Sequence, residues 1–134
     1  MFLNVGYAEA GPADGPAVIL LHGWPYDIHS FDDVAPLLAA SGYRIIVPYL
    51  RGYGPTRFLS SETFRNGQPS AIALDIIALM DALKVGKAIL AGFDWGARTA
   101  NIIAAVWPEA SGSNSTSALT VFERSPGLIG RSNR

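Results

Sequence analysis

The sequence contains no cysteine, and only two of its 134 residues are histidine. A chain without cysteine forms neither a disulfide nor a thiolate metal site. No apolar run approaches the roughly 20 residues that a membrane-spanning helix requires, and the first residues lack the basic segment and apolar core of a secretion signal. We therefore expect a cytoplasmic protein that needs no metal and no cofactor.

Charge is also scarce, because Asp, Glu, Lys and Arg together make up 16% of the chain and the net charge is −1. No basic cluster is present that would attract nucleic acid or an anionic membrane surface. Hydrophobic residues account for 49% of the chain, which is enough to bury a core, and the length suits one small domain. We expect neither a nucleic acid nor a membrane as partner.

Apolar runs that predict strands alternate with helical patterns along most of the chain. Their alternation predicts an α/β fold, with a mostly parallel sheet flanked by helices and right-handed crossovers. In such a sheet, ligands bind at the carboxyl ends of the strands. Strands are expected over residues 2–9, 17–21, 44–50 and 88–91. Helices are expected from the Asp32–Asp33 pair to Ala40, from Pro69 to a closing Gly86, and from the last strand to Trp107. Residues 58–68 are expected to be irregular.

The most informative segment joins the last of these strands to the last helix and reads Gly92-Phe93-Asp94-Trp95-Gly96. A strand that turns directly into a helix, with glycine two residues to either side of a reactive side chain, is the pattern of a nucleophile elbow. The glycines are needed because the central residue is held in strained backbone geometry that leaves no room for a neighbouring Cβ atom. The unpaired N–H groups of the helix N-terminus also favour a carboxylate at this position.

An aspartate at the centre of the elbow indicates a particular chemistry. A carboxylate attacks an acyl carbon poorly, but it can displace a leaving group from a saturated carbon and form an alkyl-enzyme ester. Water, activated by a base, then hydrolyses that ester while backbone N–H groups hold the oxyanion. Epoxides and alkyl halides are substrates of this kind. The alternative is that Asp94 is only the N-cap of the helix, a position where aspartate is favoured.

Two further motifs accompany the elbow. His22-Gly23-Trp24-Pro25 directly follows the apolar run 17–21, and the segment PYLRGYG at 48–54 follows the next strand. With the elbow, they resemble the α/β-hydrolase superfamily, and within it the epoxide hydrolases and the related dehalogenases that use an aspartate nucleophile. The resemblance covers roughly residues 2–108. Tyr49 departs from the family's PDxRGYG pattern, which usually has Asp there.

The resemblance implies a role for each motif position. Asp94 would be the nucleophile, and the backbone N–H groups of Trp24 and Trp95 would form the oxyanion hole. The remaining motif positions would be structural: His22, Gly23, Pro25, Gly92 and Gly96.

Several side chains near these motifs leave alternatives open. Pro25 follows either a cis bond, which the resembled motif often contains, or an ordinary turn. The indole of Trp95 could donate its N–H to a departing halide, line an apolar pocket or serve only in packing. Arg98 could bind a substrate carboxylate, but the haloacetate-specific relatives usually carry arginine directly after the nucleophile as well, so we expect a structural ion pair. We expect His29 in a surface loop.

The resembled hydrolases also need a histidine base and an acidic partner from a region after a cap domain. This sequence has no histidine beyond His29. From Ala110 onward the chain becomes rich in Ser, Asn and Arg, with a net charge of +2 against −3 for residues 1–109, and only residues 118–122 could form a strand. We expect 1–109 to be the amino-terminal half of an α/β-hydrolase domain, truncated before the cap and C-terminal half, and 110–134 to be an atypical tail, frame-shifted or disordered.

Two functional hypotheses follow. The first is an epoxide hydrolase-like hydrolase, inactive as an isolated chain, with haloalkane or haloacetate dehalogenase as the alternative. Trp24 favours the epoxide enzymes, because many haloalkane enzymes carry a polar residue at this position. The second is a non-catalytic fragment. An incomplete sheet leaves an unpaired edge and an exposed apolar face, so we also expect self-association.

Overall fold

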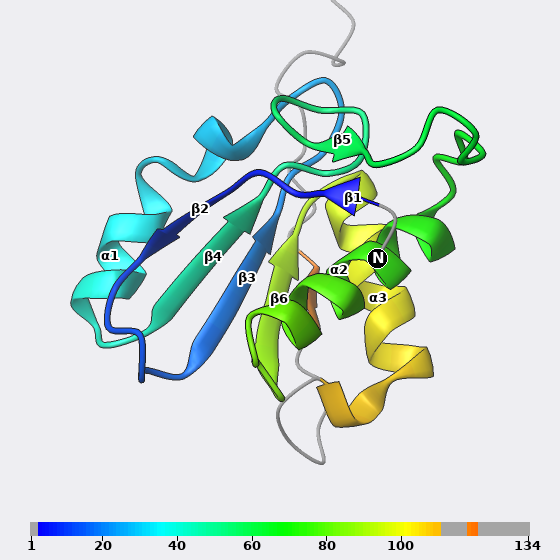
Figure 1. The fold of residues 1–134 in the computed structure, drawn as a ribbon. Coiled ribbons are helices and arrows are strands. Elements are labelled where there is room, and N and C mark those ends of the chain that lie inside the picture. Colours follow the sequence, from blue (N-terminus) through cyan, green and yellow to red (C-terminus); the bar gives the residue numbers. More distant parts are fainter. Residues whose placement is uncertain (1–2, 111–117, 121–134) are drawn as a thin grey trace, which may run out of the picture.

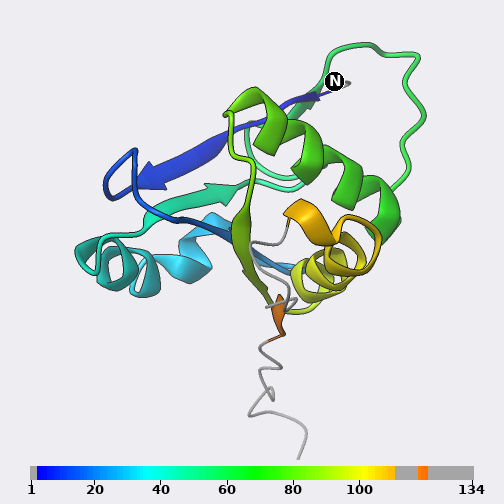
Figure 2. The same cartoon turned by 90° about the horizontal axis from the view of Figure 1, so that it is seen from below.

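A computed structural model describes residues 3–110 and 118–120, and shows a main sheet with helices on both of its faces (Figures 1 and 2), beside a separate two-stranded sheet. The α-helices α2 and α3 lie on one side and the short helix α1 on the other (Figure 2). The predicted fold class is thereby confirmed. In chain order the elements are β1 (Leu3–Asn4), β2 (Tyr7–Ala10), β3 (Ala17–Leu21), the 3-10 helix η1 (Ile28–Phe31), α1 (Val34–Ala40), β4 (Arg44–Pro48), β5 (Arg57–Phe58), α2 (Pro69–Ala82), β6 (Ala88–Gly92), α3 (Trp95–Val106), the 3-10 helix η2 (Pro108–Ala110) and β7 (Ala118–Thr120).

The strands of the main sheet lie in the order β2-β4-β3-β6-β7. The pairs β4–β3, β3–β6 and β6–β7 are parallel, and β2 is antiparallel to β4 at one edge. Because parallel strands end at the same edge, the three sequence motifs, which follow β3, β4 and β6, come together there. Position in the sheet therefore joins segments that are up to about seventy residues apart in the chain.

Alternating side chains of the central strands fill two separate apolar clusters. Ile19 and Leu21 of β3 face α2 and α3, where they pack with the buried side of α2. Val18 and Leu20 face the other way, toward α1 and η1. Both faces of β3 are thus buried, which explains why its sequence is a continuous apolar run instead of an alternating one.

Helix α2 begins at the predicted Pro69 but ends earlier than predicted. The turn that stops it is centred on Lys84, whose φ is 56°, and not on Gly86. The amide of Val85 donates to the Met80 carbonyl at 2.8 Å and that of Lys84 to the Asp81 carbonyl at 3.1 Å. These two bonds form a Schellman motif, in which glycine usually occupies the position that Lys84 has here.

The structure also corrects the expectations at other boundaries. The predicted strand 2–9 is broken after Asn4, and its first part pairs with β5, whose second residue, Phe58, begins the segment expected to be irregular. Asp33 occupies the N-cap position of α1, yet its side chain accepts no capping hydrogen bond. Of the expected tail, only residues 110 and 118–120 are described, and the latter form the edge strand β7. The expectation for 110–134 as a whole lies outside the described residues.

Candidate active site

Asp94 stands between β6 and α3 in a backbone conformation that is rare for a residue with a side chain. Its φ is 52° and its ψ is −120°, a combination that persists only where the surrounding structure enforces it. Although Asp94 occupies the N-cap position of α3, its carboxylate makes no capping hydrogen bond with that helix. Instead, Oδ2 accepts a hydrogen bond of 3.0 Å from the backbone N–H of Trp24. The side chain is exposed and directed at the HGWP loop, so the simple N-cap interpretation does not describe it.

Close backbone packing explains the glycines around Asp94. A Cβ atom on Gly23 would lie 2.5 Å from the Asp94 Cβ, and one on Gly92 would lie 2.6 Å from the carbonyl carbon of Gly96. A Cβ on Gly96 would overlap the carbonyl oxygen of Leu21. Each of these contacts involves a backbone or Cβ atom that cannot move aside. The elbow and the HGWP loop therefore approach each other at a distance that only glycine permits.

His22 is fully buried and serves as a link between two loops. Its Nε2 accepts a hydrogen bond of 3.1 Å from the Leu50 amide, and its Nδ1 lies 3.2 Å from the Gly23 carbonyl oxygen. Since Nε2 is an acceptor, the proton of the neutral ring is assigned to Nδ1, which donates to Gly23. Burial lowers the pKa of this imidazole, which favours that neutral form. These contacts agree with the expected structural role.

The HGWP loop presents the backbone of Trp24 to Asp94, and not its indole. The peptide bond between Trp24 and Pro25 is cis, which decides between the two alternatives for Pro25. The Trp24 side chain is 67% exposed. Within the described residues, the Asp94 carboxylate receives a hydrogen bond from the Trp24 amide and none from the Trp95 amide. The Trp95 amide is the first of helix α3, and amides of a first turn have no acceptor within their helix.

The expected ion pair of Arg98 is wrong for the part of the chain that the structure describes. The Arg98 side chain is exposed, and its guanidinium carbon lies 5.2 Å from the centre of the Trp95 ring. This is a cation–π contact between neighbours one turn apart on α3. It gives the partly buried Trp95 indole a packing partner, which supports the packing alternative for this side chain.

The segment after β4 contributes Tyr53, which the sequence did not single out, and Tyr49, which the sequence marked only as a departure from the motif. Tyr53 packs edge-on against His22, with ring centroids 4.7 Å apart. Burial, and secondly the negative charge of Asp94, raise the pKa of the Tyr53 hydroxyl, so this group stays protonated near Asp94. Tyr49, which replaces the family's usual Asp, lays its ring against Gly54, where any Cβ would collide with it. The motif marked the loop, but only the fold shows these contacts.

His29 lies on the surface, as expected. Its Nδ1 is 2.8 Å from Asp27 Oδ1, and the side chain is 65% exposed. Asp27 also accepts a hydrogen bond from the His29 amide at 2.9 Å, and so caps η1. The neighbouring carboxylate raises the pKa of His29. His29 therefore interacts with its own loop.

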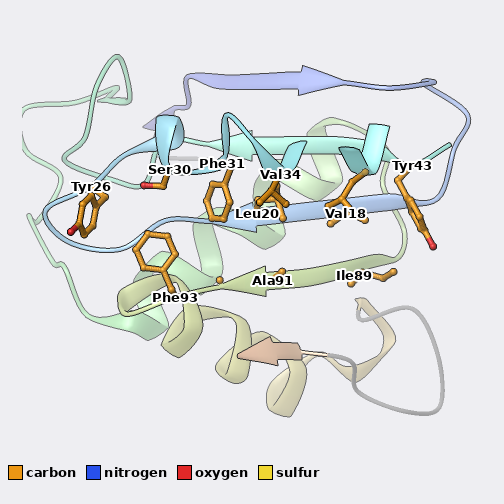
Figure 3. Close-up of a pocket in the computed structure, with 12 residues that line it drawn as sticks. Val18, Leu20, Tyr26, Ser30, Phe31, Val34, Tyr43, Ile89, Ala91 and Phe93 are labelled. Atoms are coloured by element: carbon orange, nitrogen blue, oxygen red, sulfur yellow. The ribbon is translucent and has the colours of Figure 1, made fainter. Parts of the chain in front are cut away.

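A cavity of about 710 Å³ lies on the α1 side of the sheet (Figure 3). Phe93 closes one end of it and makes ring contacts with Tyr26 and Phe31, with centroids 5.9 and 5.8 Å apart. Asp94, Trp24 and Trp95 do not line this cavity. It is an apolar hollow beside the elbow and not the space in front of the carboxylate. Its walls come from β3, β6, η1 and α1, and include Val18, Leu20, Val34, Leu38, Tyr43, Ile89 and Ala91.

The described residues contain no group of three or more His, Cys, Asp or Glu side chains arranged to hold a metal ion. None of their helices has the length and apolar character needed to cross a membrane.

Comparisons with known proteins agree with this geometry. A model of the α/β-hydrolase fold matches residues 16–110. An epoxide hydrolase of Caballeronia sordidicola is 39% identical over 62% of the chain and 25% of its own length. A haloalkane dehalogenase of Mycobacterium marinum is 35% identical over 70% of the chain and 31% of its own length. A crystal structure of a candidate epoxide hydrolase from Klebsiella pneumoniae is 67% identical, with a TM-score of 0.83, over 84% of this chain and 37% of that one. The chain thus spans about a quarter to a third of the length of these curated relatives.

Proposed function

The chain belongs to the α/β-hydrolase fold family, in the branch of the epoxide hydrolases and haloalkane dehalogenases, and on that premise we propose that Asp94 is the nucleophile of an epoxide hydrolase-like reaction. The observation that carries the proposal is the strained Asp94 backbone together with the hydrogen bond from the Trp24 amide to Oδ2. Strain of this kind is retained where it presents a side chain for use.

The hydrogen bond from Trp24 gives the two carboxylate oxygens of Asp94 different roles. Oδ2 is held by the Trp24 amide, which leaves Oδ1 free to attack a saturated carbon of a small-molecule epoxide. The new bond joins Oδ1 to that carbon, the carbon–oxygen bond of the ring breaks, and the released alkoxide takes a proton from solvent water, leaving hydroxide. Oδ2 then becomes the carbonyl oxygen of the ester. It already lies beside an N–H group that can stabilise negative charge when water attacks the ester. The first-turn amide of Trp95 is the second proposed donor.

Completing the cycle requires a base that activates this water. His22 is enclosed between two loops, with both ring nitrogens engaged, and His29 interacts with Asp27 on the surface. We infer that residues 1–134 alone form the ester but do not hydrolyse it, and that turnover needs further polypeptide carrying a base and its acidic partner.

A second candidate reaction is displacement of halide from an alkyl halide. The similarity to the Mycobacterium marinum dehalogenase favours it, and the same Oδ1 attack would serve, with halide as the leaving group. The third candidate, a non-catalytic fragment, predicts no reaction at Asp94 at all.

Covalent labelling separates these candidates. The full chain is incubated with a terminal epoxide or a short haloalkane, digested, and mapped by mass spectrometry. We expect one adduct, on Asp94, with the epoxide reacting faster, and no adduct in the Asp94→Asn variant. Asp33→Asn is the matched control, because Asp33 is also an exposed, non-capping carboxylate at a helix N-cap position but has an ordinary φ of −87°. Faster labelling by the haloalkane favours the dehalogenase, and equal labelling of Asp33 and Asp94 contradicts the assignment of a nucleophile.

A further inference from the structure

Arg51 and Asp75 form a largely buried ion pair between the RGYG loop and α2. Arg51 Nε is 2.7 Å from Asp75 Oδ2, and Nη2 is 2.7 Å from Oδ1. The side chains are 11% and 12% exposed. The remaining Nη1 donates to the Asn66 carbonyl at 2.6 Å. The guanidinium is therefore held on three sides, in the two-pronged geometry that fixes its plane as well as its position.

From this pair, a line of contacts leads to Asp94. The residue before Arg51, Leu50, donates its amide to His22 Nε2 at 3.1 Å. On the other side of the ring, Nδ1 donates to the carbonyl of Gly23 at 3.2 Å. The next amide in the chain, that of Trp24, donates to Asp94 Oδ2. Each step is either one hydrogen bond or one residue along the backbone.

We propose that Arg51 and Asp75 are positioning residues that hold the Trp24 amide on Asp94 through the Leu50–His22 hydrogen bond. The proposal rests on the proposed function of Asp94 and adds two residues to it. With its guanidinium locked on α2, Arg51 cannot rotate, so the Leu50 amide keeps its direction toward His22. A donor to a developing oxyanion must be placed within a few tenths of an ångström, and small displacements are therefore costly to rate.

A purely structural ion pair would stabilise the fold without affecting Trp24 selectively, so the test reads the Trp24 amide directly. An amide proton that donates to a carboxylate resonates downfield, and the shift becomes smaller as the hydrogen bond lengthens. In ¹⁵N-resolved NMR spectra of the full chain, Arg51→Lys should move the Trp24 amide proton upfield, because its hydrogen bond to Asp94 Oδ2 becomes longer or less well aligned. Lysine keeps the charge but not the two-pronged geometry. Labelling of Asp94 should slow by about tenfold or more.

Arg44→Lys is the matched control. Arg44 forms an ion pair with Glu9 of β2 at 2.5 Å, and it lies at the start of β4, the end of that strand farther from Arg51. We expect it to leave the Trp24 amide and the labelling rate unchanged. If Arg51→Lys does not fold, Asp75→Glu carries the same expectation, since it keeps both charges and moves the carboxylate.

The positioning role is overturned if a folded Arg51→Lys or Asp75→Glu variant retains both the Trp24 amide shift and the labelling rate of Asp94, or if Arg44→Lys alters them equally. Failure of the proposed function is a separate result. In that case Asp94 of the unsubstituted chain is not labelled, while the Trp24 amide still responds to Arg51→Lys.

Discussion

At the scale of single residues, the site depends on close backbone approach and on one neutral histidine. Gly23 lets the HGWP loop pass within contact distance of Asp94, and His22 fixes that loop to the chain after β4. Neither role could be transferred to another side chain without moving the backbone. Substitutions here are therefore expected to act on the position of Asp94 and on stability together.

The Gly23→Ala variant should lose about 1–3 kcal/mol of unfolding free energy, because its new methyl group would lie 2.5 Å from the Asp94 Cβ. Gly67→Ala is the control, since nothing lies within 4 Å of the methyl group there and alanine restricts the unfolded chain. It should be neutral or slightly stabilising. Urea unfolding of both variants measures the difference, and equal unfolding free energies would show that the HGWP loop tolerates a Cβ beside Asp94.

The two histidines should affect stability with opposite signs as pH changes. Burial lowers the pKa of His22, so below its ordinary value of about 6.5 the unfolded chain binds more protons than the folded one. The contribution of His22 to the unfolding free energy is complete above that pH. It falls as pH drops toward the folded-state pKa, by at most about 1.4 kcal/mol per pH unit. Asp27 raises the pKa of His29, so that contribution is present at lower pH and is lost as pH rises.

NMR titration of the two imidazoles checks this directly, with an expected midpoint below about 6.5 for His22 and above it for His29. Unfolding of the His29→Gln variant at pH 7.5 and 5.5 then isolates the His22 effect. A titration midpoint of His22 at or above its ordinary value would contradict a neutral imidazole whose two nitrogens are both hydrogen-bonded.

At the scale of elements, α2 shows how a helix can end without the expected glycine. Lys84 adopts the left-handed conformation, which costs a residue with a Cβ about 1–2 kcal/mol relative to glycine. The gain that offsets this is the burial of Val85, which is 8% exposed, together with the two hydrogen bonds of the Schellman motif. Helix α2 in turn carries Asp75, so its ending also determines where the Arg51 partner lies.

The Lys84→Gly variant should therefore be more stable by about 0.5–1 kcal/mol. Lys87→Gly, another exposed lysine nearby whose φ is not positive, should instead be neutral or destabilising. Thermal and urea unfolding of both variants provide the measurement. A loss of stability in Lys84→Gly would mean that the lysine side chain makes a contribution larger than the backbone strain.

At the scale of the whole molecule, the described helices cover the two faces of the sheet unequally. Helices α2 and α3 pack on one face, whereas α1 covers β3 and β4 on the other and leaves the 710 Å³ hollow over β6 (Figure 3). Ile89 of β6 is 40% exposed there, and Leu37 of α1 is 70% exposed. Exposed apolar surface of this kind is typical of an interaction site or of an aggregation-prone surface.

Self-association thus stays a prediction, and the hollow over β6 gives it a location. Sedimentation velocity should show mass increasing with protein concentration, and Ile89→Lys should reduce that increase by placing a charge in the hollow. Leu59→Lys is the control, because Leu59 is 65% exposed on a loop and does not line the hollow. A monomer at every concentration, or equal effects of the two lysines, would contradict the prediction.

Much of this architecture was determined by the sequence itself. Apolar runs and glycine positions are local signals, so the strands β3, β4 and β6, the helix α3 and the elbow at Asp94 could be predicted from neighbouring residues alone. The order of the three motifs was enough to predict the family. Where local signals conflicted or were weak, as at Lys84, Gly86 and the broken strand before Gly6, the predicted boundaries were wrong, because burial elsewhere outweighed local preference.

The partners of polar side chains were decided only by the tertiary structure. The sequence showed Arg51, Asp75, His22 and Leu50 at separations of up to about fifty residues, with nothing to pair them. It also favoured an ion pair for Arg98, which stacks on Trp95 instead. A hydrogen bond or ion pair depends on tenths of an ångström between atoms brought together by packing, and no pattern along the chain specifies distances of that kind.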